Sequence, residues 1–229
     1  YEISLGLVGS EMCIRDRYNT NRLIISGQSA LYYEDYVLSI QYFNQALAAK
    51  PYLYEPWFYR GLAKFYLDDY TGSEADVTRA IELNPYIYNM FELRGLCRIR
   101  QKHYAQAIDD YTRSINLNPQ NQTAWYNRAL CRVEDKDYAQ AQLDLDTVVT
   151  RWQSYASAYS LKAQVYLLQT DTLTADKWLD KCLKVAPYDV DAWNMRGMIA
   201  LSRAEWKNAD TYLSKVIHLK PKNAANYVN

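Results

Sequence analysis

Prolines recur along this sequence at a fixed interval. Pro51, Pro85 and Pro119 are evenly spaced, and Pro187 and Pro221 continue the series after one gap of twice that spacing. The resulting 34-residue period indicates a repeat protein, in which each repeat needs its neighbours to bury its apolar face. The period therefore restricts the chain to arrays of small supersecondary elements and overrides a domain count based on length.

The repeat also sets the organisation of the chain. From Thr20, six such repeats follow one another without insertion, and a seventh begins at Ala224. The predicted repeats are 20–53, 54–87, 88–121, 122–155, 156–189 and 190–223, followed by the partial repeat 224–229. We therefore predict one array over residues 18–229, cut inside its seventh repeat. Residues 1–17 do not share the pattern and resemble a translated sequencing adaptor, so we expect a non-native or disordered leader.

Two positions in every repeat hold only small residues. Position 8 of the repeat is Gly27, Gly61, Gly95, Ala129, Ala163 and Gly197, and position 20 is Ser39, Ser73, Ala107, Ala141, Ala175 and Ala209. Small residues twelve apart suit two antiparallel helices whose backbones cross closely, because larger side chains would push the helices apart. We predict such a crossing in each repeat.

Larger apolar residues supply the rest of the predicted core. Position 4 is large, as in Trp57 and Trp125, and positions 20, 24, 27 and 28 share one face of a helix. Polar residues such as Asp68 and Asp69 interrupt the pattern near positions 14 to 16, and the recurring proline ends the second helix. Each repeat is therefore predicted to be a helix, a short turn and a helix, and the fold class is all-α.

With this pattern the chain resembles the tetratricopeptide repeat family. The resemblance is carried by Trp57-x3-Gly61, Ala80-x4-Pro85 and Tyr104-x2-Ala107-x3-Tyr111. It implies a right-handed α-solenoid of six helix-turn-helix repeats with the 34-residue period, plus the start of a seventh, and a concave groove lined by the first helices. Family members that hold the acidic C-terminus of heat-shock chaperones carry a set of Lys and Asn residues there, of which only Asn127 matches here. That chaperone-binding function is therefore not implied.

Catalytic and cofactor motifs are missing from the sequence. His103 and His218 have no nucleophile at a useful spacing, and Cys97, Cys131 and Cys182 occupy packing positions. No glycine-rich phosphate loop, zinc-binding helix motif or calcium loop occurs. Lys and Arg total 26, as do Asp and Glu, which gives no overall attraction to nucleic acid, and no apolar run could span a membrane. We predict that the protein is not an enzyme and has no cofactor, metal site, nucleic-acid partner or membrane span, and the compartment stays open.

Position 7 is basic in every repeat after the first. The residues are Arg60, Arg94, Arg128, Lys162 and Arg196, and position 23 is Asp76, Asp110 and Asp144 in the three middle repeats. Across a close helix crossing, residues 16 apart in this register face each other. We therefore predict structural ion pairs of Arg60 with Asp76, Arg94 with Asp110 and Arg128 with Asp144. The alternative is a ladder of cations that binds phosphate or an acidic peptide.

Positions 5 and 9 of the first helices are mostly apolar although the predicted core does not require them. The predicted partner-binding groove consists of Phe58, Leu62, Tyr66, Leu96, Tyr126 and Leu130, with Arg100 and Glu134 as its polar border. An additional apolar row of this kind favours a protein or peptide partner, bound as an extended or helical segment. Its affinity should depend weakly on salt, because burial of apolar area would drive association.

Three functions follow from this pattern. The favoured one is a non-catalytic interaction scaffold that presents a mostly apolar groove to a peptide or helix. A structural spacer or self-assembly array within a larger protein is the first alternative. A regulatory array fused to a catalytic domain outside this sequence is the second. The sequence does not identify the partner or the oligomeric state.

Overall fold

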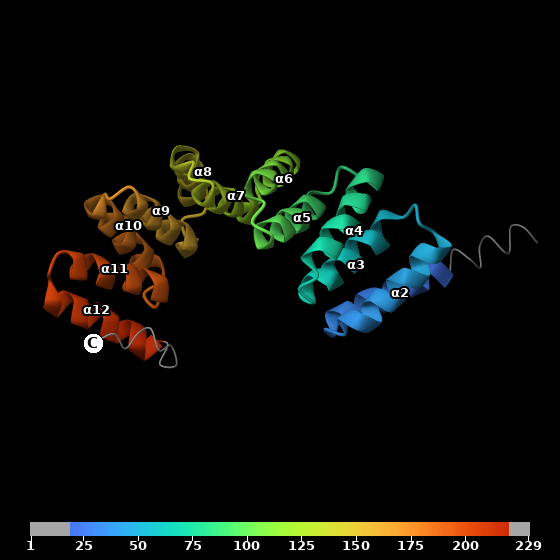
Figure 1. The fold of residues 1–229 in the computed structure, drawn as a ribbon, viewed down its shortest axis with the longest axis horizontal. Coiled ribbons are helices and arrows are strands. Elements are labelled where there is room, and N and C mark those ends of the chain that lie inside the picture. The colour runs from blue at the N-terminus through green and yellow to red at the C-terminus, as the bar shows by residue number, and fades with distance from the viewer. Residues whose placement is uncertain (1–18, 220–229) are drawn as a thin grey trace, which may run out of the picture. The chain divides into compact units, whose positions relative to one another are not determined.

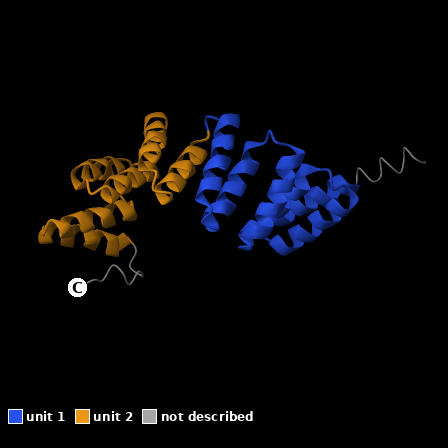
Figure 2. Cartoon of the chain, turned by 45° about the horizontal axis from the view of Figure 1, so that its top comes forward, with its two compact units in different colours: residues 1–120 blue, residues 121–229 orange. Residues whose placement is uncertain are grey.

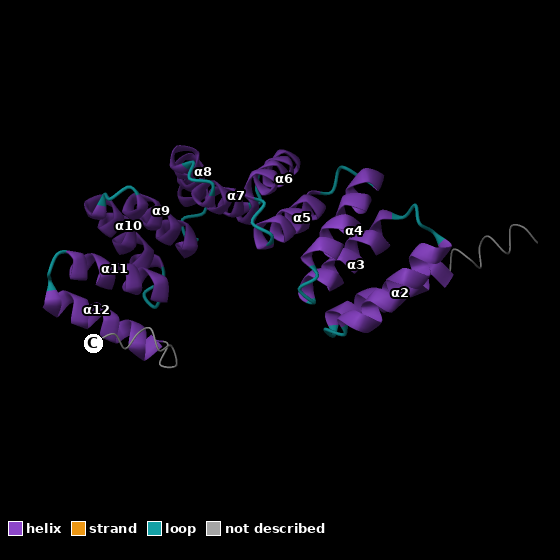
Figure 3. Cartoon of the chain, in the orientation of Figure 1, coloured by secondary structure: helices purple, strands orange, loops and turns teal. Residues whose placement is uncertain are grey.

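Helices and short turns make up the part of the chain that the structure describes, residues 19–219 (Figures 1 and 3). In this computed structural model, residues 19–32 are helical and eleven further helices follow. Their bounds are α2 Tyr36–Ala49, α3 Tyr54–Tyr66, α4 Tyr70–Leu83, α5 Tyr88–Arg100, α6 Tyr104–Leu117, α7 Gln122–Glu134, α8 Tyr138–Arg151, α9 Ala156–Leu168, α10 Thr172–Val185, α11 Val190–Ser202 and α12 Trp206–Leu219. Residues 19–219 contain no strand, which confirms the predicted all-α fold. The predicted leader and the partial seventh repeat lie outside the described residues.

The chain divides into two compact units (Figure 2). Unit 1 ends at Gln120 and unit 2 begins at Asn121. Within unit 1, α3 packs against α4 and α5 packs against α6, and α2 contacts α3. Within unit 2 the packed pairs are α7 with α8, α9 with α10, and α11 with α12. Both units are therefore built from the predicted helix pairs. None of the helices in residues 19–219 has the length and apolar character needed to cross a membrane.

Each helix pair crosses at its small residues. A Cβ added to Gly61 would lie 2.7 Å from the Val77 side chain and 3.2 Å from the carbonyl oxygen of Ser73, both on α4. A Cβ added to Gly95 would likewise lie 2.9 Å from the ring of Tyr111 on α6. Position 8 therefore packs directly onto position 24 of the same repeat, and the absence of a side chain at Gly61 and Gly95 sets how closely the helices approach.

The turn between the two helices has the same backbone conformation in all six repeats. Position 15 has a positive φ between 57° and 65° at Glu34, Asp68, Lys102, Lys136, Thr170 and Ala204. In the third repeat, the N–H of His103 donates to the carbonyl of Arg98 at 2.8 Å, and the N–H of Lys102 donates to that of Ile99 at 2.9 Å. This is the hydrogen-bond pattern of a Schellman helix end, which requires a left-handed residue. The sequence placed a turn here but did not predict its conformation, because none of the six residues is glycine.

Aspartate side chains begin most of the second helices. The carboxylates of Asp35, Asp69, Asp137 and Asp171 each accept a hydrogen bond from the backbone N–H three residues further on. Such N-caps satisfy one of the unpaired donors at a helix start and typically stabilise it by about 1 kcal/mol. A left-handed residue followed by an aspartate cap therefore reverses the chain in four of the six repeats.

Replacing Gly61 by Leu tests the close crossing. The larger side chain has to displace Val77 and the α4 backbone, so we expect a loss of about 1–3 kcal/mol in the free energy of unfolding. Ala141→Leu, at position 20 on the second helix of the fourth repeat, should give a loss of similar size. Urea unfolding monitored by circular dichroism measures both, with Gln106→Leu on the exposed surface of α6 as the control. A Gly61→Leu chain that unfolds with the parent would contradict the crossing.

Ala204→Gly tests the left-handed turn. A left-handed conformation costs a residue with a Cβ about 1–2 kcal/mol, whereas the greater freedom of glycine in the unfolded chain costs about 0.5–1 kcal/mol. We therefore expect a small net gain in stability, below about 1 kcal/mol. The matched control is Ala139→Gly, an exposed site inside α8, where a loss is expected. If both substitutions lower the unfolding midpoint equally, the turn does not store the inferred strain.

Candidate functional site

The first helices of neighbouring repeats contact one another within each unit. In unit 1, α3 contacts α5, and in unit 2, α9 contacts both α7 and α11. These helices carry the residues predicted to form a groove. The predicted groove residues are divided between the two units, with Phe58 to Arg100 in unit 1 and Tyr126 to Glu134 in unit 2.

In unit 1, three predicted groove residues lie half-buried on α3 and α5. Phe58 and Leu62 of α3 pack against a buried cluster that includes Met90 and Leu93 of α5. Leu96 of α5 is also half-buried. Part of the Phe58 and Leu62 side chains therefore serves the contact between helices, and all three side chains keep part of their surface exposed.

Tyr66 and Arg100 occupy position 13 and lie against the preceding repeat. The ring of Tyr66, at the end of α3, stacks on Tyr36 of α2 with 5.1 Å between ring centroids. The guanidinium carbon of Arg100 lies 5.8 Å from the ring centroid of Tyr70, the first residue of α4. Both side chains thus contact the first residue of a second helix in the preceding repeat. They lie at the C-terminal ends of α3 and α5.

Unit 2 contains a hollow of about 410 Å³ between its first helices. Its apolar lining residues are Tyr126, Leu130, Leu161, Leu167 and Met195, from α7, α9 and α11. Its polar lining residues are Ser157, Ser160, Gln164, Asp189, Asp191 and Asn194. The predicted groove residues Tyr126 and Leu130 therefore share one concave site, while Glu134 is exposed at the end of α7 and does not line it.

The polar side of this hollow was missed from the sequence. The predicted groove residues all stand at positions 5, 9 and 13 of their repeats. Ser157 and Asp191 instead occupy position 2, and Asp189 directly precedes α11. Burial is the main cause that raises the pKa of Tyr126 to about 12, and Tyr155, Asp191 and Asp189 raise it further. The Tyr126 phenol therefore stays protonated at neutral pH and lies within the electrostatic influence of both carboxylates.

The basic residues of position 7 face aspartates in the three middle repeats. The distance from Arg Nη2 to Asp Oδ1 is 2.6 Å for Arg60 and Asp76, 2.6 Å for Arg94 and Asp110, and 2.7 Å for Arg128 and Asp144. The three aspartate side chains are at most 5% exposed. These arginines are therefore engaged inside their own repeats.

A second cation holds each of these aspartates and was not predicted. Lys64 lies 2.8 Å from Asp76, Arg98 lies 2.8 Å from Asp110, and Arg132 lies 2.6 Å from Asp144. These cations stand at position 11, one helical turn after position 7, so both bases lie on one face of the first helix. The sequence signal was a basic residue at position 11 in the same three repeats that carry Asp at position 23.

Position 7 also reaches the second helix of the preceding repeat. Nη1 of Arg60 donates to Asn44 Oδ1 at 2.6 Å, and Nη1 of Arg94 donates to Thr78 Oγ1 at 3.3 Å. In the last two repeats, Lys162 pairs with Asp146 and Arg196 pairs with Asp180. Asn44, Thr78, Asp146 and Asp180 all occupy position 25 of their repeats. The basic side chains at position 7, which we call the basic stripe, thus connect neighbouring repeats as well as the two helices of one repeat.

Aromatic rings replace the aspartate at position 23 in repeats five and six. Lys162 Nζ lies 4.1 Å from the ring centroid of Trp178, and the guanidinium carbon of Arg196 lies 5.3 Å from that of Tyr212. A cation over the face of an aromatic ring is attracted by the negative charge density of that face. The cation at position 7 therefore has an intramolecular partner in these repeats too.

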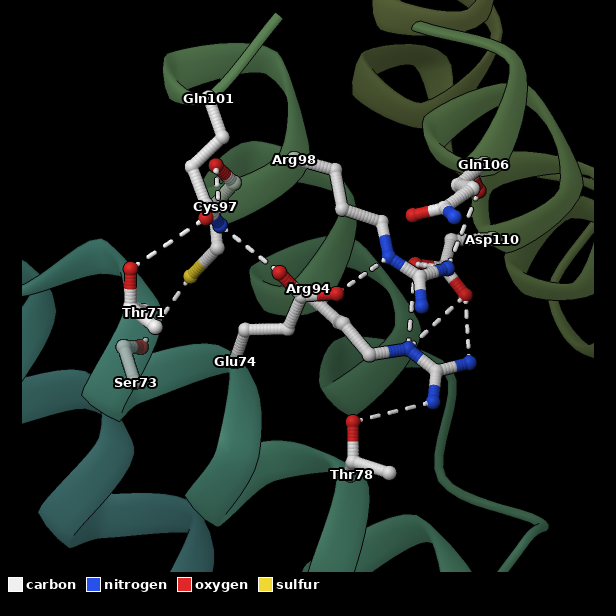
Figure 4. Close-up of polar contacts among 10 residues, drawn as sticks. All are labelled: Thr71, Ser73, Glu74, Thr78, Arg94, Cys97, Arg98, Gln101, Gln106 and Asp110. Carbon is white, nitrogen blue, oxygen red and sulfur yellow. Dashed lines mark hydrogen bonds and ion pairs between the residues drawn. The ribbon is translucent and has the colours of Figure 1, made fainter. Parts of the chain in front are cut away.

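Figure 4 shows how dense the polar packing becomes around Asp110. Arg94 and Arg98 both reach this carboxylate, and Arg98 also lies 2.8 Å from Glu74 of α4. Gln101 donates to the other oxygen of Glu74 at 2.7 Å. Burial raises the pKa of Asp110, and the two guanidinium groups oppose that effect. The cluster fixes α4, α5 and α6 to one another.

The described cysteines are poor nucleophiles. Burial raises the pKa of Cys97 to about 11 and those of Cys131 and Cys182 to about 12. Since the thiolate is the reactive form, these side chains are inert at neutral pH. His103 and His218 are exposed, at the start of α6 and in the last turn of α12.

Asp110→Ala tests the structural role of the basic stripe. The substitution leaves the largely buried guanidinium group of Arg94 without a carboxylate and leaves Arg98 with Glu74 only, so we expect a loss of about 3–5 kcal/mol in the free energy of unfolding. The control is Glu82→Ala, which removes the exposed pair of Arg79 and Glu82 and should cost less than about 1 kcal/mol. Urea unfolding distinguishes the two substitutions. Equal small losses would contradict the structural role and favour the alternative, in which the basic stripe binds phosphate or an acidic peptide.

Comparison with solved structures supports the fold. PilW, a widely conserved type IV pilus biogenesis factor, superposes with a TM-score of 0.76 and 16% identity over 90% of this chain and 95% of its own. For pilF of Pseudomonas aeruginosa the TM-score is 0.74 and the identity 14%, over 93% and 96%. For YrrB, described as a TPR protein with an unusual peptide-binding site, the values are 0.62 and 15%, over 80% and 95%. No curated protein matches the chain.

Sequence profiles of the tetratricopeptide repeat match three stretches of the chain. They cover residues 58–121, 93–142 and 156–189. These stretches together span more than half of the sequence and coincide with helix pairs that cross at small residues. The chain therefore belongs to the tetratricopeptide repeat family.

Proposed function

We propose that this protein is a non-catalytic scaffold that binds extended or helical protein segments on its first helices. The family and fold support a role in protein–protein interaction. The observation that carries the proposal is that the first helices have two sets of side chains in different environments. Position 7 is engaged within the protein, whereas Phe58, Leu62 and Leu96 of unit 1 and Tyr126 and Leu130 of unit 2 keep part of their apolar surface exposed.

Apolar contact would supply the binding energy. Each 100 Å² of apolar surface removed from water contributes about 2.5 kcal/mol before the costs of association are subtracted. On the face of unit 1, around Phe58, Leu62 and Leu96, such binding would respond weakly to salt, because no exposed carboxylate or free cation is required. Tyr66 and Arg100, which lie against the preceding repeat, would contact only the end of a bound segment.

A catalytic role has little support from the described residues. Their thiols are protonated and their two imidazoles are exposed far apart in the sequence, without a matching nucleophile. A general base or nucleophile needs a partner within hydrogen-bond reach. We therefore assign the function to binding.

One observation favours the alternative of an array that packs against more protein. Ile25, at position 6 of the first repeat, is 64% exposed, whereas Leu93 and Leu161 at the same position are 5% and 3% exposed. Ile25, Tyr33, Leu38 and Tyr42 also line a hollow of about 440 Å³ beside the first helix pair. Among residues 19–219 no helix covers this repeat-packing face, which fits a structural spacer or a self-assembling array.

The triple variant Phe58→Ser, Leu96→Ser, Tyr126→Ser tests the scaffold proposal. Capture from the source proteome should fall by about tenfold or more, because a few central apolar anchors carry most of the energy of an interface. Circular dichroism must first show that the variant is folded, since all three side chains are partly buried.

The matched control replaces three exposed apolar residues of second helices, Val37→Ser, Leu143→Ser and Leu173→Ser. This control should capture the same partners as the parent. Equal capture by the triple variant and the parent would reject the scaffold proposal and favour the spacer.

A further inference from the structure

The hollow of unit 2 has the size and lining of a ligand site. Its volume of about 410 Å³ lies within the range common for small-ligand pockets, and it is open between three consecutive first helices. Tyr126 and Leu130 of α7, Leu161 of α9 and Met195 of α11 form its apolar surface. Leu161 is 3% exposed and belongs to a buried cluster, so this apolar surface is continuous with the core of unit 2.

The charge of this hollow has only one sign. Asp189 and Asp191 line it, and its lining includes no Lys, Arg or His. Oδ1 of Asp189 accepts a hydrogen bond from the N–H of Ala192 at 2.7 Å, which fixes the carboxylate at the start of α11. Among the residues the structure describes, neither aspartate forms an ion pair. They differ in this from Asp110, whose charge two arginines balance.

Tyr126 connects the apolar and acidic parts of the hollow. It lines the hollow together with Asp189 and Asp191, and its pKa is raised by burial and, to a smaller extent, by the charges of both aspartates. The ring is held edge-on to Tyr155, with 5.3 Å between centroids. A fixed aromatic ring beside carboxylates suits a side chain with an apolar stem and a cationic head.

We propose that the hollow of unit 2 binds a Lys or Arg side chain of a peptide segment, together with a neighbouring apolar side chain. The alkyl stem lies on Tyr126 and Met195, and the cationic head reaches Asp189 and Asp191. The apolar neighbour packs on Leu130 and Leu161. This inference rests on the proposed scaffold function and specifies the chemistry of the segment that unit 2 prefers.

The lining distinguishes this occupant from a hydrated cation. A small hydrated ion gains nothing from the apolar surface of Tyr126, Leu161 and Met195, whereas the stem of Lys or Arg buries its methylene groups there. Gln164 and Asn194 are exposed at the same hollow and can exchange hydrogen bonds with the backbone of an extended peptide. A basic residue within an apolar peptide uses both parts of the lining.

The test uses fluorescein-labelled peptide pools with the core Leu-X-Leu and randomised flanks. X is Arg, Lys, citrulline or Glu, and citrulline keeps the shape of Arg without its charge. Fluorescence anisotropy with the full chain should give a Kd about tenfold lower for the Arg and Lys pools than for the citrulline pool. The difference should shrink when the ionic strength is raised to about 0.5 M, because salt screens partly exposed charges.

The double variant Asp189→Asn, Asp191→Asn should remove this preference. Asn caps helices as well as Asp does, so the start of α11 is preserved. The control is Asp135→Asn, Asp137→Asn, which removes two charges with the same spacing elsewhere in unit 2, including the N-cap of α8. The control should retain the preference of the parent for the Arg and Lys pools.

The outcomes separate this inference from the scaffold function. If the Arg and citrulline pools bind equally, or if the Asp189→Asn, Asp191→Asn chain keeps the preference, the inference is rejected while apolar peptide binding stands. If no pool binds the parent, the inference is also rejected, and the capture experiment with Phe58, Leu96 and Tyr126 decides the scaffold function independently. Loss of the preference in that variant alone supports the inference.

Discussion

The basic side chain at position 7 is the interaction on which the packing of the repeats depends. Arg94 illustrates it, because its guanidinium group holds Asp110 of its own repeat and Thr78 of the repeat before. A carboxylate as deeply buried as that of Asp110 is costly unless its charge is balanced, and two guanidinium groups balance it. The small residue that follows, Gly95, lets the second helix approach closely enough for this contact. Steric and electrostatic requirements are thus met by two adjacent residues.

Periodicity made most of the fold predictable from the sequence. Because every repeat places the same residue classes at the same positions, the small residues at position 8 indicated the helix crossings, and the prolines indicated the helix ends. The same register brought Arg60 opposite Asp76, whose side chains lie 2.6 Å apart. Each repeat contacts only its neighbours, so a pattern that recurs in six repeats is enough to predict the helices and their packing within a repeat.

Features that depend on two repeats at once were not predictable in this way. The contact of Arg60 with Asn44 and the stacking of Tyr66 on Tyr36 depend on how one repeat sits on the next, which positions within a single repeat do not encode. The hollow of unit 2 was missed for the same reason. Its acidic side is formed by Asp189 and Asp191, around the start of α11, whereas the apolar residues that signalled a groove come from α7.

The left-handed residue at position 15 also makes the repeats interchangeable. All six turns have φ near +60° at an exposed residue, and the residue types there range from Glu34 to Lys136 to Ala204. The side chain is therefore free to vary while the backbone path stays constant. A boundary placed at this residue joins any first helix to any second helix without a new turn geometry. Duplication or exchange of whole repeat-length blocks at that point would lengthen the array while leaving each chain reversal intact.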